Sequence, residues 1–185
     1  MSTSIYGVLK KVAKEQTLVS IHTNPDNWSS CSVGYVHSIS RTHVRLRAVN
    51  RDGEDAGYEV RKLEEIFKID FGGKYEHKLE HLRGNQENIF QEVALRKDKD
   101  QDLILGTLKQ AKDLDLVVVI WGHDPDDSLI GFVEYVDNNG ARIRVLDDFG
   151  MEDGYSTIKS SEITAVDCNA RSEQVLKFLY KTGRG

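Results

Sequence analysis

One sequence unit occurs twice in this chain, and this repeat limits the possible folds more than any other feature. Residues 131–155, GFVEYVDNNGARIRVLDDFGMEDGY, align without a gap with residues 34–58, GYVHSISRTHVRLRAVNRDGEDAGY. The similarity continues outward on both sides, between 7–21 and 106–120 and between 64–82 and 161–179. A repeat of this length is the size of a domain, so each copy has to bury its own apolar residues. We therefore predict two copies of one small domain, produced by internal duplication.

The repeat divides the 185 residues into two units and a connection. We predict a first unit over residues 1–82 and a second over residues 103–185, each with flanking helices. Residues 83–102 are predicted to form a partly helical linker, because NIFQEVALRK favours a helix and KDKDQD is typical of a solvated stretch. The two copies differ in length between HTNPDNWSSCSV and WGHDPDDSLI, where a Pro-Asp turn can absorb an insertion.

Each copy has the pattern of a short helix, five short strands and a closing amphipathic helix. VRLRAV and ARIRVL, at residues 44–49 and 141–146, alternate apolar and arginine residues with the period of a half-buried strand. The remaining strands are predicted at 18–22, 33–40, 58–61 and 66–70, and at 116–121, 130–137, 155–159 and 163–167. So many short strands bury one core by curling into a barrel or tight sandwich. The predicted fold is mainly β, with two tandem five-stranded small barrels.

The second copy resembles the Sm-like family of small barrels, in which a helix precedes five strands. GFVEYVD, at residues 131–137, is similar to that family's Gly-x-hydrophobic-x-x-hydrophobic-Asp strand, and IKSSEITAV is similar to its last-strand segment. The resemblance implies an RNA pocket formed by Asp137, Asn139 and Lys159, although Lys159-Ser160 stands where the family has Arg-Gly. SH3-like barrels share the same strand plan and fit the sequence almost as well.

Composition narrows the functional classes. Lys and Arg number 25 against 30 Asp and Glu, so the net charge of −5 argues against general affinity for nucleic acid phosphates. The two cysteines, Cys31 and Cys168, form no CxxC motif, which indicates a reducing cytoplasm without disulfides. No apolar run is long enough for a signal peptide or for the ~20 residues of a membrane span. We expect a cytoplasmic protein that has no membrane contact and needs no cofactor.

Two arginine pairs recur in the third predicted strand of each copy. Arg45 and Arg47, like Arg142 and Arg144, are two residues apart and point to the same outward face, ~7 Å apart along the strand. Such planar cations could clamp a phosphate or carboxylate. The alternative is pairing with neighbouring acidic side chains such as Glu134.

Aromatic residues offer the other candidate contacts. Tyr58 and Tyr155, each after a glycine, could stack against a base or a peptide proline, or could lie half-buried on the barrel rim. Both tryptophans lie near the first hairpin loop. Trp121 ends an apolar strand and is expected to be buried, whereas Trp28, in NPDNWSS, is expected at the surface.

The acidic and histidine clusters point to no catalytic or metal site. Asp70 and Asp167 follow the last strand of each copy, and we interpret them as helix N-caps. HDPDD, at residues 123–127, is interpreted as a solvated turn and lacks the spacing of a calcium loop. His77 and His81 fit an exposed helix face. We predict a non-catalytic binding or scaffold protein with a protein or peptide partner, able to form homo-oligomers through strand edges; the alternative is an RNA-binding Sm-like protein.

Overall fold

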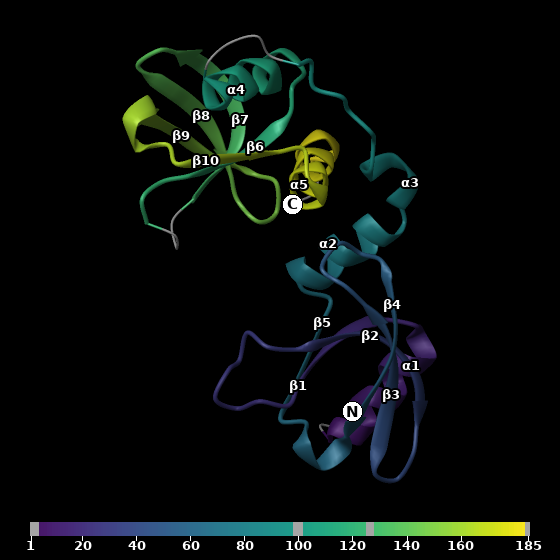
Figure 1. Cartoon of the computed structure of the whole chain (residues 1–185). Coiled ribbons are helices and arrows are strands. Elements are labelled where there is room, and N and C mark those ends of the chain that lie inside the picture. The colour runs from purple at the N-terminus through teal and green to yellow at the C-terminus, as the bar shows by residue number, and fades with distance from the viewer. Residues whose placement is uncertain (1–3, 98–101, 125–127, 184–185) are drawn as a thin grey trace. The chain divides into compact units, whose positions relative to one another are not determined.

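The computed structural model describes residues 4–97, 102–124 and 128–183 (Figure 1). The chain forms two compact units, Met1–Gln86 and Glu87–Gly185. The fold is mainly β, with a five-stranded antiparallel sheet and a few helices in each unit. No helix among the described residues has the length and apolar character needed to span a membrane.

The first unit consists of one sheet flanked by helices. Its elements are α1 (Ile5–Glu15), β1 (Leu18–His22), β2 (Ser32–Ile39), β3 (His43–Val49), β4 (Asp55–Lys62), η1 (Leu63–Glu65), β5 (Lys68–Phe71) and α2 (Lys74–Arg83). The strands lie in the order β4-β3-β2-β1-β5. β4 and β5 are the two edges, and in the described part of the unit no ladder between them closes the sheet.

The second unit has the same sequence of elements after a short helix. They are α3 (Gln86–Ile89), α4 (Leu103–Asp113), β6 (Val117–Trp121), β7 (Ser128–Asp137), β8 (Gly140–Leu146), β9 (Glu152–Lys159), η2 (Ser160–Glu162), β10 (Ala165–Cys168) and α5 (Arg171–Thr182). The order β10-β6-β7-β8-β9 is that of the first sheet read from the other edge. Each sheet is therefore a meander of four strands, with the fifth strand placed beside the first.

Each unit has its own apolar core between its sheet and its first helix. Leu9 and Val12 of α1 pack with Leu46 of β3 in the first unit. Leu108 of α4 packs with Ile143 of β8 in the second. The first helices begin at side-chain caps, because Ser4 and Asp102 accept hydrogen bonds from backbone N–H groups three residues later.

The second strand of each sheet approaches its neighbour so closely that only glycine fits. A Cβ atom on Gly34 would lie 2.4 Å from the carbonyl oxygen of Arg47, and one on Gly131 would lie 2.0 Å from that of Arg144. A register shift follows in both strands, between Val36 and Ser38 in β2 and at the corresponding point in β7. Such irregularities bend a strand, so both sheets are bent at the same place.

Candidate binding groove of the first unit

The first unit contains an open groove of about 710 Å³ beside the β1–β5 edge of its sheet. It is lined by two strands, by the loop between β1 and β2, and by the start of α2. Its lining includes the side chains of Ser20, His22, Trp28, Cys31, Lys68, Asp70, Phe71, Lys74, Tyr75 and Glu76. Antiparallel pairing places Ser20 opposite Asp70 and His22 opposite Lys68, so these four residues share one face of the sheet.

The floor of the groove is polar, although it is buried. Ser20, His22 and Glu76 are all almost inaccessible to solvent. The Ser20 hydroxyl donates a 2.5 Å hydrogen bond to Glu76 Oε1, and the Gly73 N–H donates a 3.0 Å bond to Glu76 Oε2. Glu76 therefore closes the first turn of α2 and joins it to β1, which fixes one wall of the groove.

Asp70 joins His22 to Lys68. His22 Nε2 lies 2.9 Å from Asp70 Oδ2, and Lys68 Nζ lies 2.6 Å from the same oxygen. Partial burial works to raise the pKa of Asp70, but the hydrogen bonds from Lys68 and His22 outweigh it and leave the pKa below its ordinary value. The other ring nitrogen of His22, Nδ1, is buried and has no hydrogen-bond partner among the described residues.

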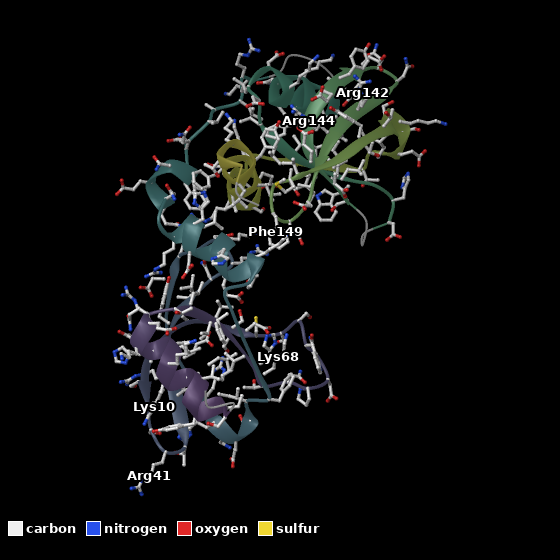
Figure 2. All side chains as sticks on the ribbon, turned by 180° about the vertical axis from the view of Figure 1, so that it is seen from behind. Lys10, Arg41, Lys68, Arg142, Arg144 and Phe149 are labelled. Atoms are coloured by element: carbon white, nitrogen blue, oxygen red, sulfur yellow. The ribbon has the colours of Figure 1, made fainter. Side chains whose placement is uncertain are left out.

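The rim of the groove is aromatic. Trp28 is 63% exposed, and Phe71 and Tyr75 are also substantially accessible. The Trp28 ring packs at 5.5 Å from the Phe67 ring, and Lys68 Nζ lies 5.7 Å from the Trp28 ring centre. Lys68, which lines the groove, is labelled in Figure 2. Exposed rings above a buried polar floor are the composition expected of a binding site.

The loop that carries Trp28 is shaped by its own side chains. The Trp28 indole N–H donates to the carbonyl of Pro25 at 2.8 Å. Asn24 and Asn27 accept hydrogen bonds from the backbone N–H groups two residues later, at 3.1 and 3.2 Å. These are Asx turns, which hold a loop without help from the rest of the sheet.

Cys31 lies beside the polar floor and is suited to packing. Burial raises the pKa of its thiol, and the nearby carboxylates of Glu76 and Asp70 act in the same direction. A thiol with a raised pKa is a poor nucleophile. In the second unit burial raises the pKa of Cys168 to about 11. Neither cysteine has the environment of a catalytic thiolate.

The arginine pairs are on strands β3 and β8 and are not among the residues that line the groove. Arg45 Nε donates to His37 Nδ1 at 3.3 Å, and its guanidinium lies 6.0 Å from the Tyr58 ring centre. Arg47 forms an ion pair with Asp55 and donates a hydrogen bond to its carboxylate. This hydrogen bond lowers the pKa of the Asp55 carboxyl. These contacts engage both side chains within the first unit.

Arg144 belongs to a network within the second unit, while Arg142 is exposed to solvent (Figure 2). Arg144 lies 2.9 Å from Glu134 and 3.1 Å from Glu152, and it donates a 2.6 Å bond to the Tyr180 hydroxyl. The pairing with Glu134 that the sequence offered as an alternative to an anion clamp is therefore present. Arg142 keeps its charge accessible.

The two candidate tyrosines occupy equivalent places on the outer faces of the sheets. Tyr58 and Tyr155 are 62% and 63% exposed. Their registers match, because Tyr58 pairs with Arg47 and Tyr155 pairs with Arg144. Neither is among the residues that line the groove.

Asp137, Asn139 and Lys159 come together at one end of the second sheet. Gly140 pairs with Lys159, which brings β9 beside the β7–β8 turn. The Asp137 carboxylate accepts bonds from the Asn139 N–H at 2.8 Å and the Gly140 N–H at 3.2 Å. The bond from the Asn139 N–H lowers the pKa of Asp137; burial opposes it, and the bond from the Gly140 N–H helps to keep the pKa below its ordinary value. Asp137 thus shapes the turn, and Lys159 is exposed beside it.

The interpretation of Asp70 and Asp167 as helix caps is wrong. Both lie inside the last strand of their sheets, and Gly73 and Ala170 are the N-cap residues of α2 and α5. Asp167 instead accepts a 2.7 Å bond from the indole N–H of Trp121, which is only partly buried. The strand continues past each aspartate, to Phe71 and to Cys168, because its backbone stays paired with the first strand of the same sheet.

The remaining acidic and histidine candidates add no metal site. Residues 125–127 of the predicted HDPDD turn lie outside the described residues. His77 lies 3.6 Å from Glu80 on the exposed side of α2. Within the described ranges no group of three or more His, Cys, Asp or Glu side chains is arranged to hold a metal ion.

The chain matches no protein-family model, no curated protein and no solved structure. The groove itself is therefore the main indication of function, although the sequence pattern does not single out most of its lining residues. The available signal is LVSIH, in which Ser20 and His22 interrupt a strand whose equivalent in the second unit reads VVVIW. Two polar side chains in an otherwise apolar strand mark a buried polar site.

Proposed function

We propose that this is a non-catalytic binding protein whose first unit holds a segment of a partner protein in the groove. The observation that carries the proposal is Trp28, a tryptophan held 63% exposed by its own loop above buried polar side chains. Tryptophan is the residue most enriched at the energetic centres of interfaces. An exposed indole beside a groove of about 710 Å³ supports binding of a side chain and its flanking backbone.

The edge strand β5 supports an extended partner segment. β5 forms one wall of the groove, and among the described residues it pairs only with β1. A peptide laid along such an edge gains backbone hydrogen bonds, while alternate side chains enter the adjacent groove. The same property underlies the prediction of homo-oligomers through strand edges.

We also propose that both units are small barrels of the Sm-like or SH3-like type that arose by duplication. Support comes from the equal strand orders, from the close approach at Gly34 and Gly131, and from the equivalent registers of Tyr58 and Tyr155. In this proposal the second unit supplies a scaffold and the first supplies the binding site.

A selection of random peptides on the full-length chain tests the proposal. Selected peptides should bind the Trp28→Ala variant about 30-fold more weakly, since truncation of a central aromatic contact costs about 2 kcal/mol. Tyr155→Ala is the matched control, because Tyr155 is equally exposed but lies in the other unit. Failure to select any peptide, or equal binding by the Trp28→Ala variant, contradicts the proposal. A salt-sensitive gel shift of oligo(U) that is lost in Lys159→Ala would instead favour RNA binding.

A further inference from the structure

The β2–β3 hairpin of the first unit carries a concentration of positive charge that the second unit lacks. Residues 37–47 contain three arginines and two histidines, but no Asp or Glu. The equivalent residues 134–144 contain two arginines together with Glu134 and Asp137. With the histidines left out, the first hairpin therefore has a net charge of +3, whereas the charges of the second cancel.

Arg45 is the central cation of this hairpin. Its Nε donates to His37 Nδ1 at 3.3 Å, and its guanidinium lies 6.0 Å from the Tyr58 ring centre. The side chain is exposed, and among the described residues it forms no ion pair. The guanidinium is thus positioned by two rings rather than by a carboxylate, which leaves its charge and its Nη donors accessible.

The carboxylate on the adjacent strand does not offset the charge of Arg45. Asp55 forms its ion pair with Arg47, and Arg83 Nη2 lies 3.6 Å from the same carboxylate oxygen. One carboxylate is therefore already shared by two guanidinium groups. Arg45, two residues along β3, gains nothing from it except a screened long-range attraction.

Arg41 is a second cation of this kind, at the tip of the hairpin. Its side chain projects from the turn between β2 and β3 (Figure 2). Together with Lys62 and Glu64 it lines an opening of about 300 Å³. Lys62 pairs with Glu65 at 3.3 Å, whereas in the described part of the chain Arg41 and Glu64 form no ion pair. The turn thus adds a cation with which an incoming carboxylate can pair.

The second unit shows that the sheet does not require this uncompensated charge. Glu134, which occupies the place of His37, lies 2.9 Å from Arg144. Glu152, which occupies the place of Asp55, lies 3.1 Å from the same guanidinium. The two arginines of the second hairpin therefore have two carboxylates beside them, although the strand order is the same.

We propose that the outer face of the β2–β3 hairpin binds an acidic segment of a partner protein through Arg45 and Arg41. Carboxylates fit the planar fork of an arginine. Tyr58 and Val60 on β4 add exposed ring and apolar surface beside Arg45. The net charge of −5 disfavours a nucleic acid, whose affinity rests on many phosphate contacts. None of these residues is among those that line the groove, so the surface is a second one.

A short acidic peptide tests this surface directly. Acetyl-Gly-Asp-Gly-Asp-Gly-amide is titrated into the full-length chain at low ionic strength, with the peptide containing Asn in place of Asp as the control. Amide chemical shifts of residues 37–47 and 58–62 report binding by NMR. We expect the Asp peptide to bind about tenfold more tightly than the Asn peptide, since each exposed ion pair contributes a factor of about three. Added salt should remove the difference.

Two kinds of variant make the test specific to the hairpin. Arg45→Ala and Arg41→Ala should each weaken the Asp peptide about threefold. Arg142→Ala is the matched control, because Arg142 is also exposed but lies in the second hairpin. His37→Glu, which copies the second unit, should weaken the peptide at least as much as Arg45→Ala, because the new carboxylate competes for the Arg45 guanidinium.

The hairpin and the groove are told apart by Trp28→Ala, which should leave binding of the Asp peptide unchanged. Loss of binding in Trp28→Ala would place the acidic peptide in the groove and overturn the proposal. Equal binding by the wild type, Arg45→Ala and His37→Glu would also overturn it, as would an absence of shifts in residues 37–47. Tighter binding of oligo(U) than of the Asp peptide at the hairpin would show that the partner is a nucleic acid instead.

Discussion

Equivalent aspartates in the two units accept hydrogen bonds from different donors. In the first, Asp70 of β5 accepts from the His22 ring; in the second, Asp167 of β10 accepts from the indole of Trp121. Both donors end the first strand of their sheets. The aspartate is thus a scaffold element that ties the last strand to the first. What changes is the donor: imidazole leaves a second nitrogen to be satisfied, whereas indole has only one polar atom.

The same contrast holds for the buried glutamates. Glu76 and Glu173 are both buried in the first turn of the closing helix. Opposite the aspartate, the first sheet has Ser20, which donates to Glu76, and the second has Val119. The polar floor therefore requires residues that only the first unit has, although the backbone plan beneath it is common to both. Equal strand orders therefore do not produce equal sites.

The prediction with the largest effect tests whether the two sheets have the same close backbone approach at their second strands. Gly34→Ala and Gly131→Ala should each destabilise their unit by about 3 kcal/mol, because the added methyl group would overlap a carbonyl oxygen of the next strand. Hydrogen exchange of backbone amides, followed separately in each unit, measures both losses of stability. Gly57→Ala and Gly154→Ala are matched controls with φ near +80° but open space around them, and should cost about 1 kcal/mol. A large effect in one unit alone would show that the two sheets bend for different reasons.

An intermediate effect tests the polar floor. Ser20→Val, which copies Val119 of the second unit, removes the donor to Glu76 Oε1 and should cost about 2 kcal/mol. Ser20→Thr keeps a hydroxyl and should be nearly neutral. Hydrogen exchange of the buried backbone amides of the first unit provides the measurement, because it separates this unit from the second. Unchanged stability of Ser20→Val would mean that burial of Glu76 does not require the hydrogen bond from β1. The polar floor would then not distinguish the two units.

The smallest effect concerns acid stability. The pKa of Asp70 is lower in the folded protein than its ordinary value of 3.8, so its contribution is present above that pH and is lost as the pH falls through the folded pKa. Lys68→Ala, which copies Ala165, should reduce this loss in thermal unfolding between about pH 5 and pH 2. Its size is below about 1 kcal/mol, because the Asp70 side chain is 41% exposed. An unchanged pH profile would show that Lys68 does not hold Asp70.

The sequence predicts the sheets better than the groove, for a physical reason. Alternation in VRLRAV and ARIRVL marks strands β3 and β8 directly, since a half-buried strand has to alternate. The pattern predicts the fourth strand at 58–61, yet β4 already begins at Asp55, because strand pairing with β3 overrides the weak strand preference of Gly57.

The groove depends on contacts that are distant in sequence. Ser20 and Glu76 are 56 positions apart, and His22 and Asp70 are 48 apart. Local patterns favoured an N-cap for Asp70, because a carboxylate just before a helix commonly has that role. Trp28 could be placed at the surface from its turn-rich surroundings, but not over a polar floor. Only the strand order β2-β1-β5 brings these residues together.

The Asx turns around Trp28 have a thermodynamic consequence. A ring that is already restrained, through Pro25 and its own loop, has little rotational freedom left to lose when a partner arrives. A larger part of the favourable free energy of each contact then remains in the net binding free energy. Because the corresponding connection is shorter in the second unit, the stiffness of this loop can be altered without disturbing the first sheet.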